Sequence, residues 1–166
     1  MYKLTQTNSV IRITDGAIIP DDTNNNDRKS YLEWLAQSNT PTPADVIPPP
    51  SKPEIWARIK TERDRRIQNG GYKVGAKWYH SDTFSRTQQM GLVMMGANIP
   101  ANTPWKTMDG SFVIMTQTLA GQIFGTAAAS DIAIFSAAEA HRVAMEASAD
   151  PAAYDFTGGW PPMFGA

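Results

Sequence analysis

A run of prolines near the end of the chain's first third constrains its fold more than any other feature. The segment "TPTPADVIPPPSKPE", residues 40–54, contains six of the twelve prolines. Each proline fixes φ and removes a backbone donor, so a regular helix or inner strand cannot pass through this segment, and it should be extended. We predict a linker at residues 47–53 between a small module, residues 1–46, and a larger domain, residues 54–166.

The small module is predicted to be a hairpin followed by one helix. In "YKLTQTNSVIRITDGAIIP" the dipeptide Asp15-Gly16 lies between β-rich runs, which is the strongest local signal of a tight hairpin. After a polar loop, "DRKSYLEWLAQSN" has the periodicity of a short helix, with Asp27 as a candidate N-cap. Its apolar face would consist of Tyr31, Leu32, Trp34 and Leu35.

The larger domain is predicted to contain three helices and two hairpins, which makes the fold class α+β. The expected order is a helix at 54–71, a hairpin at 72–81, a helix at 83–98, a hairpin at 103–116 and a helix at 117–148. The last helix carries an apolar stripe that consists of Leu119, Ile123, Ala127, Ile134, Ala138 and Met145, widened by Phe124, Ile132 and Phe135. Such a helix suits either a buried place within the monomer, which we favour, or a seam between subunits.

Composition excludes several kinds of site. Fifteen Lys and Arg against sixteen Asp and Glu leave no basic excess, so we expect no nucleic-acid partner. The chain has no cysteine, and its two histidines are far apart, so no metal or cofactor site is predicted. The first residues lack an apolar signal segment and no apolar run reaches about eighteen residues. We therefore expect synthesis in a cytoplasm and no membrane insertion.

The block "WYHSD" gathers groups that could belong to a hydrolase. His80 could act as a base oriented by Asp82, with Ser81 or Ser85 as nucleophile. Members of a triad converge from separate positions or specific turns, whereas these residues crowd into one hairpin end, and no Gly-x-Ser-x-Gly elbow occurs. We therefore interpret Trp78, His80 and Asp82 as structural: His80 donates to a backbone carbonyl, and Ser81 or Asp82 caps the next helix. No catalytic residue is predicted.

The aromatic residues are the candidate anchors. Each tryptophan falls in a different segment, and the tail "DPAAYDFTGGWPPMFGA" follows no helical or strand period. Such a tail either wraps its own domain or anchors to another chain, since aromatic side chains are favoured at interfaces. The candidate interface residues are Tyr31, Trp34, Tyr154, Phe156, Trp160 and Phe164.

Several blocks of the larger domain recur together in a known family. The segments "ERDRR", "WYHSD", "SRTQQ" and "WKTMDGSFV" occur in this order between residues 59 and 147, and this region resembles an uncharacterised domain of tailed-phage and prophage proteins. The N-terminal "DGAIIPDDTNNNDRKSYLEWLAQSNTPTPAD" resembles a short module attached to phage tail-region proteins.

The resemblance implies a non-enzymatic structural protein of the virion tail that docks to a tail-fibre, tail-tip or baseplate protein. It brings no catalytic residues with it. By analogy with fibres, we also expect a homo-oligomer. Two alternatives stay open, namely a fibre-assembly chaperone that leaves the particle and a receptor- or glycan-binding tip.

Overall fold

A computed structural model describes residues 1–165 and confirms the α+β class. The chain divides into two compact units, Met1–Pro49 and Pro50–Ala166. The boundary between the units falls within the predicted linker, residues 47–53, and the last two residues of that segment begin the first helix of the second unit.

The first unit contains a three-stranded antiparallel sheet in the order β1-β2-β3. The predicted hairpin is present between β2 and β3, and Gly16 at φ 73° makes its turn in the left-handed region that glycine tolerates. A further strand, β1, was not predicted; it pairs with β2 across residues 5–9, which contain no Asn-Gly or Asp-Gly turn signal. The strands are β1 (Tyr2–Leu4), β2 (Val10–Arg12) and β3 (Ile18–Ile19).

One helix, α1 (Asn26–Ala36), covers one face of this sheet and closes a small aromatic core. The ring centroid of Tyr2 lies 5.0 Å from that of Tyr31 in an edge-to-face arrangement. Asn25 is the N-cap, because its side chain accepts a hydrogen bond from the Arg28 N–H at 3.1 Å. The prediction of Asp27 as the cap was therefore wrong. Asp27 lies inside the first turn and binds the Arg12 guanidinium at 2.5 Å.

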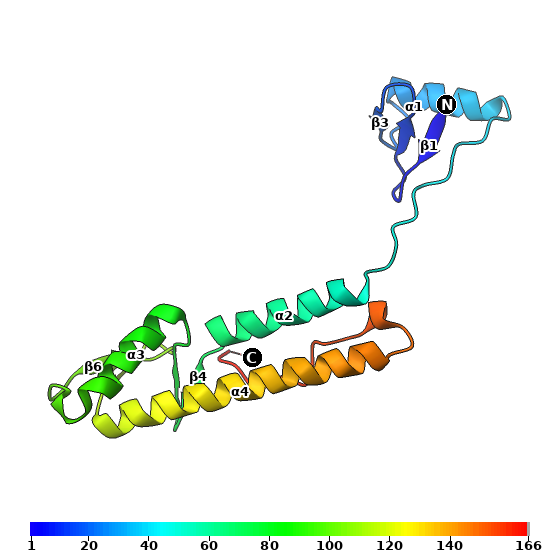
Figure 1. Ribbon diagram of the computed structural model, residues 1–166. Coiled ribbons are helices and arrows are strands. Elements are labelled where there is room, and N and C mark those ends of the chain that lie inside the picture. Colours follow the sequence, from blue (N-terminus) through cyan, green and yellow to red (C-terminus); the bar gives the residue numbers. More distant parts are fainter. Residues whose placement is uncertain (166) are drawn as a thin grey trace. The chain divides into compact units, whose positions relative to one another are not determined.

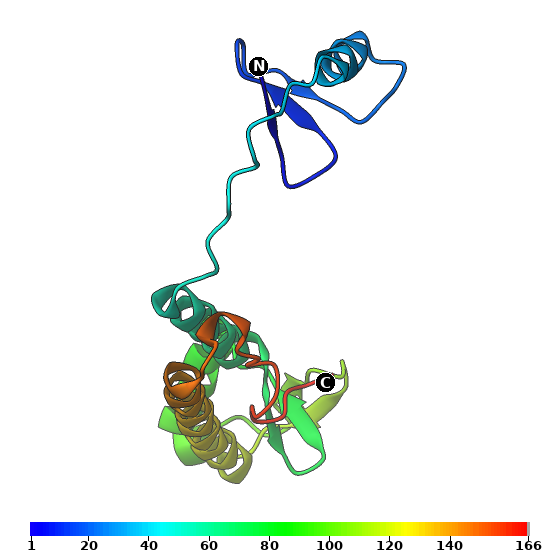
Figure 2. The same cartoon turned by 90° about the vertical axis from the view of Figure 1, so that its right-hand side faces the viewer.

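The second unit contains the predicted three long helices and two hairpins (Figures 1 and 2). Two short 3-10 turns, η1 and η2, add to them. The elements are α2 (Lys52–Asn69), β4 (Tyr72–Val74), β5 (Lys77–Tyr79), α3 (Thr83–Met95), η1 (Gly96–Asn98), β6 (Pro104–Lys106), β7 (Phe112–Ile114), α4 (Gln117–Ala147) and η2 (Pro151–Ala153).

Local signals explain where α2 begins and ends. Ser51 and Glu54 form a capping box that satisfies the first backbone donors, so the helix starts inside the proline segment. The helix ends at Gly70 and Gly71. Gly71 has φ +69°, and an added Cβ there would lie 3.0 Å from the Tyr79 carbonyl oxygen, so only glycine fits at this turn.

Helix α4 is the longest helix of the second unit, and both α2 and α3 pack against it. Its first half packs against α3 and the hairpin strands, and its second half packs against α2, as Figure 1 shows. Of the predicted stripe, five residues are buried: Ile123, Ala127, Ile134, Ala138 and Met145. The prediction that Phe124, Ile132 and Phe135 widen this stripe was wrong, because they are 49%, 68% and 48% exposed. The helix is thus covered on one face only.

By length and composition α4 could cross a membrane, contrary to the expectation that no segment is long and apolar enough. The core helix of a soluble protein passes the same test, so this property alone assigns no membrane role. Only 22% of its most apolar window is buried within the chain.

The segment after η2 runs back between α2 and α4 (Figure 1). Tyr154, Phe156 and Trp160 are partly buried and pack against the core cluster that contains Ile55 and Met145. The backbone N–H of Phe164 donates to the Gly70 carbonyl at 2.9 Å, which ties the tail to the end of α2. Of the two options for the tail, the structure therefore shows the one in which it wraps its own domain.

Candidate functional site

The "WYHSD" block lies where β5 meets α3, and its polar groups bind the backbone. Ser81 is buried, and its Oγ accepts a hydrogen bond from the Gly71 N–H at 2.9 Å. Asp82 is the N-cap of α3 and accepts from the Ser85 N–H at 2.9 Å and the Ser85 hydroxyl at 2.6 Å. These bonds from Ser85 hold the pKa of Asp82 below its ordinary value.

His80 takes part in this network through its backbone. Its carbonyl accepts a hydrogen bond from Gln89 Nε2 at 3.0 Å. Among residues 1–165, no hydrogen bond joins the His80 ring to a backbone carbonyl or to either serine hydroxyl. The His80 ring therefore does not make the predicted hydrogen bond to a backbone carbonyl. A serine nucleophile also needs a base within hydrogen-bond reach, so this arrangement lacks the contact on which a triad depends.

Arg86 is the centre of the polar network, and it was not singled out from the sequence. Its guanidinium binds both carboxylate oxygens of Asp131, at 2.6 and 2.9 Å, so that α3 and α4 are joined by a bidentate pair. It also donates to the backbone carbonyls of Ser81 and Ile67, at 2.6 and 3.2 Å. The sequence did hold a signal for an ion pair at this place. Asp131 is the one charged residue between positions 117 and 138, and a carboxylate in so apolar a helix needs a partner.

A second buried contact lies beside this pair. The Tyr72 hydroxyl bonds Gln89, and the guanidinium of Arg86 lies 5.6 Å from the centroid of the Tyr72 ring. Burial raises the pKa of Tyr72 to about 12, so the phenol stays protonated at neutral pH. The Tyr72 hydroxyl therefore serves as a fixed hydrogen-bond donor that joins β4 to α3.

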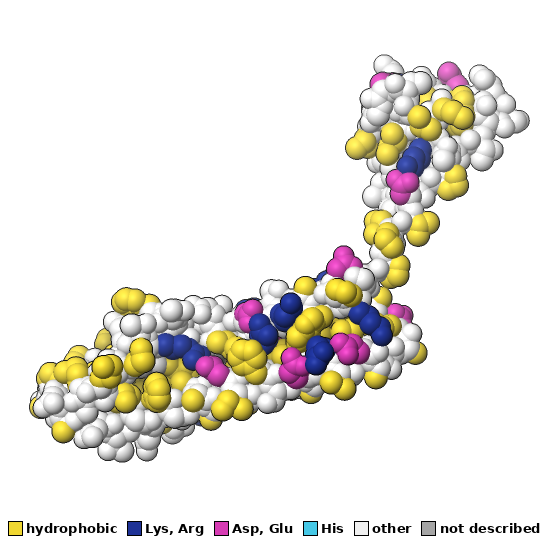
Figure 3. Space-filling model, in the orientation of Figure 1, with side chains coloured by type: hydrophobic (Ala, Val, Ile, Leu, Met, Phe, Trp, Pro, Cys, Tyr) yellow, Lys and Arg dark blue, Asp and Glu magenta, His cyan; other side chains and the backbone are white. Residues whose placement is uncertain are grey.

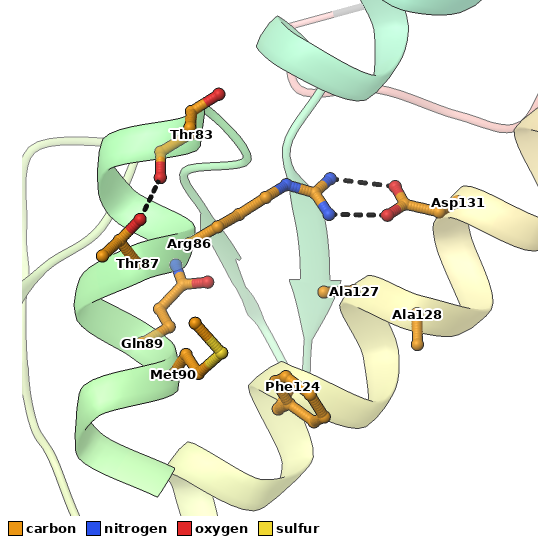
Figure 4. A pocket seen from close by; sticks show the side chains of 9 residues that line it. All are labelled: Thr83, Arg86, Thr87, Gln89, Met90, Phe124, Ala127, Ala128 and Asp131. Carbon is orange, nitrogen blue, oxygen red and sulfur yellow. Dashed lines mark hydrogen bonds and ion pairs between the residues drawn. The ribbon is translucent and has the colours of Figure 1, made fainter. Parts of the chain in front are cut away.

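Arg86, Gln89 and Asp131 border a cleft of about 370 Å³ between α3 and α4 (Figure 4). Figure 4 shows Arg86 reaching across to Asp131, with Met90 and Phe124 at the other end of the cleft. Because the charged pair is mutually satisfied and the rest of the lining is largely apolar, the cleft suits an apolar side chain more than a charged ligand. The described residues contain no group of three or more His, Cys, Asp or Glu side chains that could hold a metal ion.

The six candidate anchors lie within their own units. In the first unit Tyr31 is buried and Trp34 packs against Tyr2, with ring centroids 5.1 Å apart. In the second unit Phe164 packs edge-to-face on Trp78 at 6.2 Å, and the other three form the tail contacts described above: Tyr154, Phe156 and Trp160. Aromatic content marked these residues, but it does not distinguish an internal core from an interface.

Part of the exposed apolar surface of the first unit is aliphatic and lies on the outer face of its sheet. Ile11 and Ile18 are cross-strand neighbours, and because side chains alternate along a strand, they face away from the core residues Val10 and Ile19. Ile18 is 72% exposed. Ile13 and Met1 extend this face and are also exposed. We call Met1, Ile11, Ile13 and Ile18 the outer sheet face.

The second unit matches a known family over almost its whole length. Residues 50–158 match the family described as "Domain of unknown function (DUF4376)". The chain belongs to this family. The DUF4376 match begins at the residue where the second unit begins, and it includes the Arg86–Asp131 pair and most of the tail. No curated protein and no solved structure shows significant similarity to the chain.

Proposed function

We propose that this protein is a non-enzymatic structural component of a bacteriophage tail, and that its first unit docks it to a tail-fibre, tail-tip or baseplate protein. The phage context rests on the sequence resemblance of both regions. The docking role rests on one observation: a separate small unit presents the apolar outer sheet face, which its own helix does not cover.

The outer sheet face has the properties of an anchoring surface. Its isoleucines lie on a hydrogen-bonded sheet, so they are held in position before binding and lose little freedom when a partner covers them. Full burial of each large aliphatic side chain contributes about 1.5–3 kcal/mol. Burial of these side chains would supply the apolar centre of the contact, and the charged residues around them would set its orientation.

The test measures incorporation of the protein into particles. Wild-type protein should be found by mass spectrometry in purified particles of the encoding phage at a fixed copy number, and protein lacking residues 1–49 should be absent. Ile18→Glu should reduce incorporation at least about tenfold, because a buried unpaired charge costs more than 1.4 kcal/mol. Val46→Glu is the matched control, since Val46 is 87% exposed and lies off the sheet.

Each outcome decides between the alternatives. Equal incorporation of the Ile18→Glu and Val46→Glu proteins would refute docking through the outer sheet face. Wild-type protein that is abundant in the lysate but absent from particles would replace the proposal with an assembly chaperone. Binding of the purified protein to host cells, unaffected by Ile18→Glu, would favour a receptor-binding tip.

A further inference from the structure

Helix α4 carries an apolar surface that residues 1–165 leave largely exposed, although the Arg63 guanidinium lies 4.8 Å from the centroid of the Phe135 ring. Its exposed residues at three- and four-residue spacing form a single stripe along the helix, on a face different from the one that packs in the core. We call this the α4 stripe: Gly121, Gly125, Ala128, Ile132, Phe135, Glu139 and Val143. Only Glu139 is charged.

The α4 stripe is long for an exposed apolar surface. The α4 stripe extends over just over three heptads, the length at which heptad pairing between helices becomes a reliable signal. Ile132, near the middle of the helix, is 68% exposed, and Val143 is 60% exposed. Figure 3 shows hydrophobic side chains exposed along much of the second unit on the face drawn.

We propose that a second copy of this chain covers the α4 stripe, with the two α4 helices antiparallel and related by a twofold axis. The axis would pass between Ala128 and Ile132. The inference stands apart from the phage-tail proposal, because it rests on the geometry of α4 alone.

The order of side-chain sizes along the stripe favours this occupant. Its first half is small and its second half is bulky. In the antiparallel register Ile132 faces Ala128 of the other copy, and Phe135 faces Gly125, so that each layer combines a large with a small side chain. A parallel pair would place Phe135 against Phe135 and Gly125 against Gly125, which crowds one layer and leaves a cavity in the other.

The charges of α4 favour the same direction. The first turn of α4 has no acidic residue and the last turn has no basic residue, so neither end of its helix dipole is balanced by its own side chains. Glu139 and Glu146 lie toward its carboxyl end. Arg142 pairs with both carboxylates within the chain. In the antiparallel register Glu139 faces Gly121 in the amino-terminal turns of the partner, whereas a parallel pair would place Glu139 against Glu139.

The first test is the oligomeric state of the full chain by analytical ultracentrifugation. Wild type should be a dimer, and Ile132→Glu should raise the dimer Kd by about 100-fold or more, because it buries a charge in the central layers. Met94→Glu is the matched control, since Met94 is 83% exposed on α3 and should leave the Kd unchanged. Circular dichroism should show both variants folded, as expected for exposed positions.

The second test determines direction, and it is possible because the chain has no cysteine. With a short bismaleimide, Ile132→Cys should cross-link to a covalent dimer and Val143→Cys should not. In the proposed register the two copies of position 143 lie roughly 39 Å apart along the axis, at about 1.5 Å per residue. Cross-linking of both variants would show a parallel pair and overturn the antiparallel register.

Two further results would overturn the proposal as a whole. One is a wild-type chain that stays monomeric at high concentration, whether or not it floats with phospholipid vesicles; flotation would assign the α4 stripe to a membrane surface. The other is a dimer with an unchanged Kd in Ile132→Glu and no cross-link in Ile132→Cys. If Ile132→Glu fails to fold, the two cysteine variants decide alone.

Discussion

The two units of this chain bury a helix face in different ways. Helix α1 has 11 residues, and a sheet of three short strands covers its apolar side in a single cluster with four buried side chains. Helix α4 has 31 residues, and it is covered piece by piece by α3, the hairpins, α2 and the tail, which form two separate clusters. One neighbour covers most of the apolar side of the short helix, where Leu32 stays 41% exposed, whereas the long helix packs against several elements and still has one exposed apolar side.

This difference predicts how each unit responds when a core side chain is removed. A core of one small cluster should be lost as a whole when a single aromatic residue is removed. A core distributed along α4 should lose stability at one place while the rest stays packed. Three experiments test this difference, in order of decreasing expected effect.

Tyr31→Ala should unfold the first unit and leave the second folded. Tyr31 is 5% exposed and contacts Tyr2, and deleting a buried aromatic side chain costs about 3–5 kcal/mol, which is comparable to the whole stability of so small a core. Two-dimensional NMR should show collapsed dispersion for residues 1–49 only. Ile18→Ala, at a 72% exposed position, should leave the spectrum dispersed. Simultaneous loss of both units would mean that they do not fold independently.

Asp131→Ala should lower the free energy of unfolding of the second unit by about 1.5–3 kcal/mol, because it leaves the partly buried Arg86 without its charged partner. Urea unfolding measures the change. Asp64→Ala is the control, since it removes an ion pair with a 62% exposed carboxylate and should cost under about 0.5 kcal/mol. Equal costs for the two variants would show that the bidentate pair does not hold α3 to α4.

The helix caps of the two units should differ in their response to acid. Asp82 titrates, and its folded pKa lies below the ordinary 3.8, so its contribution is present above about pH 4 and is lost as the pH falls below that value. Asn25, the cap of α1, has no such titration.

Accordingly, Asp82→Ala should cost about 1 kcal/mol at pH 7 and less at pH 2.5, whereas Asn25→Ala should cost a similar amount at both pH values. Urea unfolding at the two pH values, with each unit followed separately, measures this. A penalty for Asp82→Ala that does not change with pH would contradict the assignment of Asp82 as a charged cap.

Much of the local structure could be predicted because its signals are local. The last helix was expected at 117–148 and runs from Gln117 to Ala147, since its start follows a capping threonine and its end precedes Ser148 and a proline. Both hairpins of the second unit turn at glycine positions with positive φ, Gly75 and Gly110. The strand β1 was missed, because three residues carry no recognisable period and residues 5–9, which join it to β2, contain no glycine or proline turn signal.

The interaction surfaces could not be predicted in the same way. The sequence places Tyr31, Trp160 and Ile132 alike among apolar residues, and nothing in their own neighbourhoods separates a core from a surface. The structure buries the first, packs the second against its own domain and exposes the third. Arg86 was missed for the same reason, because its role depends on Asp131, which lies 45 positions away.

The order of helices and hairpins, the break at the prolines and the ends of most elements could be predicted, because caps, turns and hydrophobic periods act between residues close along the chain. Long-range packing selects which of two polar residues caps α1, which face of α4 meets its neighbours and where the aromatic tail lies. Those choices depend on contacts between distant segments, and their energies are set by packing and charge pairing that exist only once the chain has folded.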